Sequence, residues 1–133
     1  MNENLLFVED DAEDVQLTLM GFGLQKFEPQ VVVAKDGKEA LELLLAACAA
    51  ASPLPAAILT DIKMPRMDGL ELLRQIKSDL RLREIPVAIL TSSDHEADRN
   101  EALRLGAALY LMKPSSLDAY AGIVPRLREL MRA

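Results

Sequence analysis

The chain of 133 residues has few of the side chains that crosslink a protein or hold a transition metal. It contains one cysteine, Cys48, and one histidine, His95. A lone cysteine forms no internal disulfide, and this pair is too small a set of ligands for structural zinc. The sequence therefore excludes a disulfide framework and a zinc domain, and it suits the reducing cytoplasm. We expect Cys48 to fill apolar space and His95 to be a solvated surface residue.

Aromatic and basic side chains are also scarce. There is no tryptophan and aromatic content is 4%, although 50% of the residues are hydrophobic, so the core must consist mainly of aliphatic side chains. The 15 basic residues are outnumbered by 21 acidic ones, which gives a net charge of −6 and argues against nucleic acid or an anionic membrane as a partner. No apolar run is long enough to span a bilayer, and the N-terminus does not have the pattern of a signal peptide. The length fits one domain over residues 1–133.

What the sequence does contain is an alternation of short apolar runs with helix-like segments. The runs are continuously apolar, as expected for strands that helices bury on both faces, whereas the other segments show helical spacing. The predicted strands are 4–9, 30–34, 56–60, 86–91 and 107–112, and the predicted helices are 12–25, 37–49, 70–79, 95–105 and 117–131.

Each predicted helix opens with an acid or a hydroxyl that has a second acid three residues later. Such pairs can cap a helix and place negative charge at its positive end. The five pairs are Asp11/Asp14, Asp36/Glu39, Asp68/Glu71, Ser93/Glu96 and Ser115/Asp118. Asp11 is expected to cap the first helix. Pro125 lies inside the last predicted helix, so we expect a kink or a break there.

The alternation predicts an α/β fold with a doubly wound, five-stranded parallel sheet flanked by five helices, a flavodoxin-like arrangement. In such a sheet the ligand site lies at the carboxyl ends of the strands. Polar residues follow four of the predicted strands at that edge: Glu9 and Asp10 after the first, Asp61 after the third, Thr91 at the end of the fourth and Lys113 after the fifth. The sequence therefore predicts a cluster of carboxylates, a hydroxyl and an ammonium group.

Crowded carboxylates repel one another, and a hard divalent cation such as Mg²⁺ offsets that repulsion best. Asp10 and Asp61 are the candidates for direct ligation, Glu9 could hold a water, and a carbonyl from the loop after Asp61 could add another ligand. The Asp61 carboxylate could then attack phosphorus and form a mixed anhydride. Lys113 and Thr91 would stabilise the transferring group, and a cis bond before Pro114 would aim the lysine inward.

At these residues the chain resembles the receiver domains of two-component response regulators. The matching motifs, which cover nearly the whole chain, are Glu9-Asp10, Asp61, Met64-Pro65 with Asp68-Gly69, Thr91 and Lys113-Pro114. The resemblance implies that a histidine kinase phosphorylates Asp61 with Mg²⁺, and that the protein signals as a switch rather than acting as an enzyme.

The same resemblance implies a role for each residue of the site. Glu9 and Asp10 are the acid pair, and Lys63 donates a metal-binding carbonyl. Lys113 pairs with the phosphoryl group and Thr91 moves to bond it, while Tyr110 is the aromatic that turns inward as the threonine moves. Lys63 and Ser93, each two residues past a site residue, flank the path of the hydrolytic water, where Lys63 could either shield the acyl phosphate or position that water.

We expect a stand-alone receiver without an output domain, either monomer or homodimer, that signals through a protein target or onward phosphotransfer. Val8-Glu9-Asp10-Asp11 and the long loop before the third strand are similar to regulators that accompany phytochrome-type kinases. Two other functions stay open. One is a magnesium-dependent phosphatase with an aspartyl nucleophile, although such enzymes need a second acid two residues after the nucleophile, where this chain has Lys63. The other is a binding module that works without phosphate.

Overall fold

The computed structural model describes residues 2–132. It contains one parallel sheet with the strand order β2-β1-β3-β4-β5, so the predicted α/β fold is confirmed. The strands are β1 (Asn4–Val8), β2 (Gln30–Ala34), β3 (Ala57–Thr60), β4 (Val87–Thr91) and β5 (Leu109–Met112). The helices are α1 (Ala12–Leu24), α2 (Gly37–Ala49), α3 (Gly69–Ser78), α4 (Glu96–Arg104) and α5 (Val124–Arg132), and a 3₁₀ helix, η1 (Leu117–Gly122), precedes α5.

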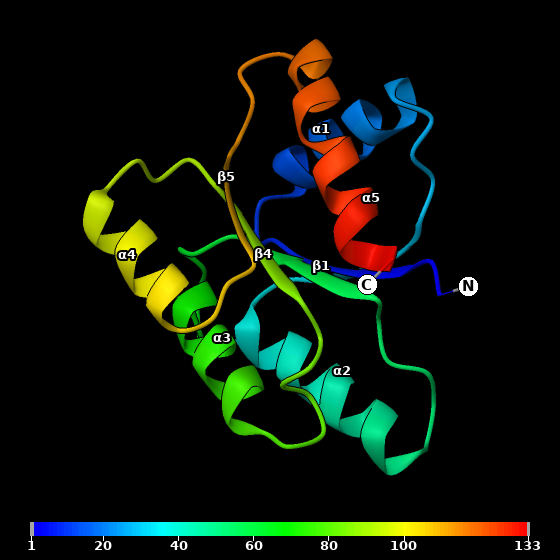
Figure 1. Cartoon of the computed structure of the whole chain (residues 1–133), viewed down its shortest axis with the longest axis vertical. Helices are drawn as coiled ribbons and strands as arrows, with labels where there is room; N and C mark the ends of the chain where they lie inside the picture. The colour runs from blue at the N-terminus through cyan, green and yellow to red at the C-terminus, as the bar shows by residue number, and fades with distance from the viewer. Residues whose placement is uncertain (1, 133) are drawn as a thin grey trace.

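The helices cover both faces of the sheet. Figure 1 shows α1 and α5 on one face and α2, α3 and α4 on the other. Alternate strand residues point to opposite faces, so Leu5 and Phe7 belong to the core under α1 and α5, whereas Leu6 and Val8 belong to the core under the other helices. This two-sided burial is why the central strands are continuously apolar. Among residues 2–132, no helix has both the length and the apolar character needed to cross a membrane.

The second strand does not follow the expectation of burial on both faces. β2 lies at the edge of the sheet, and within residues 2–132 it pairs with β1 alone. Its residues Val32 and Val33 are 55% and 38% exposed, and only Ala34 is buried. Apolar composition predicts a strand correctly here, but it carries no information about whether that strand is central or at an edge.

Three of the five predicted caps form as expected. Asp11 accepts hydrogen bonds from the backbone N–H groups of Glu13 and Asp14, and Asp36 and Asp68 cap α2 and α3 in the same way. The Ser93/Glu96 prediction is wrong, because α4 has His95 at its N-cap position, without a side-chain capping bond. Ser93 instead bonds the Asp98 carboxylate through its hydroxyl, at 2.6 Å.

The last predicted helix is broken, as expected, but the break lies before Pro125, so α5 begins only at Val124. The segment predicted as 117–131 divides at Ile123 into η1 and α5, and Pro125 becomes a first-turn residue of α5, where its missing N–H costs no intrahelical bond. The Ser115/Asp118 cap is therefore wrong; Ser116 precedes η1 and makes no side-chain capping bond. The peptide bonds of residues 2–132 are trans, including the bond before Pro114, whose isomer the sequence alone leaves open.

η1 is held against α1 by a buried tyrosine. The Tyr120 hydroxyl lies 2.9 Å from Thr18 Oγ1, and its ring packs edge-on to Phe22, with centroids 6.0 Å apart. Gly21 makes this approach possible, since a Cβ at that position would overlap the Tyr120 ring. The connection from β5 to α5 is therefore tied directly to the first helix.

We predict that Gly21→Ala lowers the free energy of unfolding by about 1–3 kcal/mol, because the new methyl must displace a buried ring. Chemical denaturation measures the change. Gly23→Ala is the matched control, since it lies on the same helix with open space around the added methyl and should be neutral or slightly stabilising. Equal stabilities for the two variants would contradict the close packing of η1 on α1.

Candidate functional site

Asp61 directly follows β3, beside the end of β1. Its backbone N–H bonds the Val8 carbonyl at 3.0 Å, which places it next to Glu9. The carboxylate is held at both oxygens: Oδ1 accepts from the Ile62 N–H at 2.6 Å, and Oδ2 lies 2.6 Å from Lys113 Nζ. Because β1 and β3 are neighbours where the strand order reverses, this is the switch point at which open α/β sheets bind ligands.

The loop after Asp61 folds back tightly on the strand end. Gly69 N–H bonds the Ile62 carbonyl at 2.7 Å, and a Cβ on Gly69 would collide with the Asp61 carbonyl oxygen, so this position requires glycine. The loop is tethered from its other side by Arg66, whose Nε donates to Asp36 at 2.8 Å. That hydrogen bond lowers the pKa of Asp36. The loop is therefore fixed at its base by Gly69 and in its middle by Arg66, and Lys63 lies between Ile62 and Arg66.

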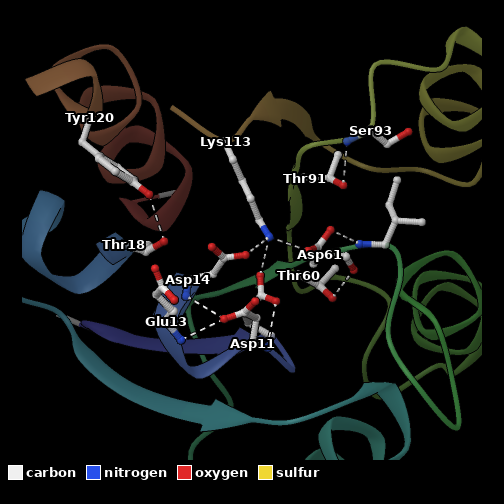
Figure 2. Close-up of polar contacts among 12 residues, drawn as sticks. Asp11, Glu13, Asp14, Thr18, Thr60, Asp61, Thr91, Ser93, Lys113 and Tyr120 are labelled. Atoms are coloured by element: carbon white, nitrogen blue, oxygen red, sulfur yellow. Dashed lines mark hydrogen bonds and ion pairs between the residues drawn. The ribbon is translucent and has the colours of Figure 1, made fainter. Parts of the chain in front are cut away.

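Lys113 is the centre of the polar cluster (Figure 2). Its Nζ lies 2.6 Å from Asp61 Oδ2, 2.7 Å from Asp14 Oδ2 and 2.8 Å from Glu9 Oε1. Burial lowers the pKa of Lys113, but hydrogen bonds with Asp14, Asp61 and Glu9 outweigh burial and raise the pKa above its ordinary value. The ammonium is therefore charged throughout the physiological range.

Glu9 is the most buried acid of the cluster, with 2% of its surface exposed. Burial, reinforced by the charge of Asp61, raises the pKa of Glu9 to about 7, against hydrogen bonds from Lys113 and the Asp11 backbone that lower it. Its Oε1 forms an ion pair with Lys113 Nζ at 2.8 Å, and among residues 2–132 no other group donates to that oxygen. A buried carboxylate oxygen with unused acceptor capacity, next to Asp61, fits a hydrated divalent cation.

The other predicted metal ligands lie around this point. Asp10 is exposed, and within residues 2–132 it forms no hydrogen bond or ion pair through its side chain. The described part of the chain contains no group of three or more His, Cys, Asp or Glu side chains arranged as a closed metal cage. Lys63 is exposed and lines a depression of about 190 Å³ together with Asp61, Thr91, Ser92, Ser93, Asp94 and His95.

On the side of β4 and β5, Thr91 and Tyr110 are linked through one residue. Thr91 is 2% exposed, and its Oγ1 accepts from the Ser93 N–H at 3.2 Å. The Tyr110 hydroxyl donates to the Ser93 carbonyl at 2.9 Å, so the tyrosine lies inward, with the Arg99 guanidinium 5.7 Å from its ring centroid. A shift of Thr91 would therefore act on the segment that Tyr110 contacts.

The fold brings Glu9, Asp61 and Lys113 into contact and places Thr91 at the same edge. Asp14, which forms an ion pair with Lys113, was missed, because in the sequence it is merely an acid in the first turn of a helix. A signal was available, since the first turn after β1 lies at the same edge as the end of β3. His95 is exposed as expected, yet it lines the depression beside Asp61.

Comparison with known proteins agrees with this geometry. The model of the response regulator receiver domain matches residues 5–124, so the chain belongs to the response regulator receiver family. Proteins of this family are phosphoacceptor domains of two-component signalling systems, served in general by histidine kinases.

Two curated relatives match most of the chain. The probable methanogenesis regulatory protein FilR2 of Methanothrix harundinacea is 34% identical over 94% of this chain and 81% of its own. Response regulator MprA of Mycolicibacterium vanbaalenii is 36% identical over 99% of this chain but 52% of its own length. The chain thus spans about half of MprA, and that protein's full activity does not transfer to it.

Solved structures of phytochrome response regulators are similar over nearly their full length. The phosphorylated cyanobacterial regulator RcpA has a TM-score of 0.85 and 30% identity, covering 100% of this chain and 96% of that one. The Mn²⁺-bound form of Rcp1 has a TM-score of 0.78 and 29% identity, covering 96% and 92%. This likeness matches the type of regulator expected from the sequence.

The buried position of Glu9 predicts a pH-dependent cost to folding in the absence of divalent cations. The folded-state pKa of about 7 lies above the ordinary glutamate value of 4.5, so ionisation of Glu9 disfavours the folded state. The free energy of unfolding therefore falls as pH rises from 4.5 to 7. Glu9→Gln should remove this fall. The free energy of unfolding of the variant, minus that of the unsubstituted protein, should therefore be about 2 kcal/mol larger at pH 8.5 than at pH 5.5.

Urea denaturation in the presence of a chelator at both pH values measures this difference. Glu13→Gln is the control, because it removes an exposed acid near the same strand end and should show little pH-dependent change. A constant offset between Glu9→Gln and the unsubstituted protein at both pH values would contradict the assignment.

Proposed function

We propose that the protein is a magnesium-dependent phosphoacceptor switch in which Asp61 takes a phosphoryl group from a histidine kinase. The observation that carries the proposal is the contact of Lys113 with Asp61 at the carboxyl edge of the sheet, beside the buried acid Glu9. The Asp61 carboxylate is held in place, the Lys113 ammonium beside it is permanently charged, and an open depression next to it lets a phosphodonor approach. These are the positioning and electrostatic elements that phosphoryl transfer requires.

Magnesium would be held by Asp10 and Asp61, by a water on Glu9 and by the backbone carbonyl of Lys63. The unused acceptor capacity of Glu9 Oε1 supports this assignment, as does the Mn²⁺ bound by the related regulator Rcp1. A bound divalent ion supplies positive charge that lowers the repulsion between the acids and an anionic donor. Mg²⁺ keeps several waters, so a site of few protein ligands suits it.

Around the Asp61 carboxylate, the neighbouring residues of the chain then have separate roles. The Ile62 N–H fixes Oδ1, while the Lys113 ammonium stabilises charge on the incoming group. The Thr91 hydroxyl would turn toward the phosphoryl oxygens and release its contact with Ser93. Because Tyr110 contacts the same residue, the change would spread to β5 and α4.

The cognate kinase in this proposal is of the phytochrome type, supported by the likeness to RcpA and Rcp1. The phosphorylated protein would act on a protein target or pass the phosphoryl group onward, either as a monomer or as a homodimer. It would catalyse no reaction beyond its own phosphorylation and dephosphorylation. The exposed Lys63, two residues after Asp61, offers no acid for the leaving group of a phosphatase.

Acetyl phosphate with Mg²⁺ should phosphorylate the protein once, and Asp61→Asn should abolish the label because an amide is no nucleophile at phosphorus. Intact-protein mass spectrometry counts the added phosphate. Glu13→Gln, which removes an acid outside the site, should keep it. A label that persists on Asp61→Asn would overturn the assignment of the phosphoacceptor, whereas turnover of unrelated phosphomonoesters would point to an enzyme.

Lys63→Ala should shorten the lifetime of the acyl phosphate by about two- to tenfold. The exposed lysine lines the depression that leads to Asp61, so removing its side chain opens the path of the hydrolytic water. Loss of the label after the donor is removed gives the rate. Lys38→Ala, an exposed lysine on α2 outside the depression, is the control; an unchanged or longer lifetime in Lys63→Ala would dismiss a shielding role.

A further inference from the structure

Asp14 is the partner of Lys113 that the proposed phosphoryl transfer leaves without a role. It lies in the first turn of α1, and its backbone N–H bonds the capping carboxylate of Asp11 at 3.2 Å. Its Oδ2 is 2.7 Å from Lys113 Nζ, and Asp61 Oδ2 is 2.6 Å from the same nitrogen, so the two contacts are almost equally short. Figure 2 shows Lys113 reaching the Asp14 and Asp61 carboxylates with the same ammonium group.

The three acids that contact the ammonium differ in their freedom to move. Glu9 and Asp61 are buried at the ends of two central strands, with side chains 1% and 10% exposed. Asp14 is 35% exposed and borders a cleft between α1 and η1 that includes Leu17, Thr18 and Tyr120. A carboxylate with access to water can release the lysine at a smaller cost than a buried one.

A lysine ammonium has three N–H donors, and three carboxylates already lie within reach of them. A phosphoryl group on Asp61 brings further acceptor oxygens and negative charge to the same ammonium. The phosphoryl oxygens then compete with the other carboxylates for the ammonium, and Asp14 is the competitor that is both partly exposed and uninvolved in the proposed metal site. Its negative charge also repels the incoming phosphoryl group.

We infer that Asp14 is a positioning residue that holds Lys113 on the α1 side and competes with the phosphoryl group for its ammonium. The carboxylate keeps the lysine extended and charged in the resting protein, and it lowers the affinity of the site for a phosphoryl group. The inference rests on the proposed function, because it assigns a counter-ion to the lysine of the same site.

The first test measures binding of beryllofluoride, a mimic of the phosphoryl group, at saturating Mg²⁺. Asp14→Asn keeps the size and an acceptor oxygen but removes the charge, so it should tighten beryllofluoride binding by about two- to fivefold, the range of a partly exposed charge contact. Its initial rate of phosphorylation by acetyl phosphate should rise in parallel.

Two matched controls separate this role from general effects. Glu13→Gln removes a neighbouring acid from the same helix turn, outside contact with Lys113, and tests the effect of net charge. Thr18→Val breaks the hydrogen bond between Thr18 on α1 and Tyr120 on η1, and it tests the effect of loosening η1 on α1. Both should leave beryllofluoride affinity nearly unchanged, because neither substitution removes a carboxylate that contacts Lys113. Asp14→Asn binding that is unchanged or weaker would overturn the inference.

A second measurement needs no phosphoryl group. In protein labelled with ¹⁵N-lysine, the Lys113 ammonium should give a ¹H–¹⁵N signal protected from water exchange, and Lys113→Arg identifies that signal by its loss. Asp14→Asn should broaden or shift the signal, whereas Glu13→Gln should not. An identical signal in Asp14→Asn would refute the contact. Failure of the unsubstituted protein to bind beryllofluoride, with the ammonium result intact, would instead refute the proposed phosphoacceptor function.

Discussion

The edge of the sheet depends on one ammonium group among several acids. Lys113, from the end of β5, contacts Asp61 from β3, Glu9 from β1 and Asp14 from α1. Three carboxylates and one ammonium leave the cluster negative when all are ionised, and the raised pKa of Glu9 reflects its burial beside Asp61. Without Lys113 the strand ends that it joins would carry unbalanced negative charge, which is costly in a partly buried site.

This arrangement is better suited to binding than to folding. A neutral residue in place of Glu9 would avoid the cost of burying an acid, yet it would offer no charge to a hydrated cation. The rest of the loop is built for rigidity: Gly69 lets the backbone close over the Asp61 carbonyl, and Arg66 is held by Asp36. The scaffold thus stabilises a polar cluster that is itself unfavourable, as expected where local structure serves a site.

The sequence predicts this site well because strand ends in a parallel sheet necessarily share an edge. Apolar runs identify the strands, and the residues that follow them identify Glu9, Asp61 and Lys113. Whether a strand is at the edge depends on sheet order, so the exposure of Val32 could not be read from its run of valines. Asp14 was hidden for a related reason, since a first-turn acid suits a helix dipole whether or not a lysine from a distant strand contacts it.

The proposed phosphoryl group would act in two directions from the same point. On the side of α4, it would draw Thr91 away from Ser93, which also receives the Tyr110 hydrogen bond. On the side of α1, it would compete with Asp14 for Lys113, next to the place where Tyr120 ties η1 to Thr18. Because Lys113 and η1 belong to one short connection after β5, release of the lysine from Asp14 would reach the surface between α1 and η1 independently of Tyr110. A partner that binds this surface and one that binds α4 could therefore respond differently to the same modification.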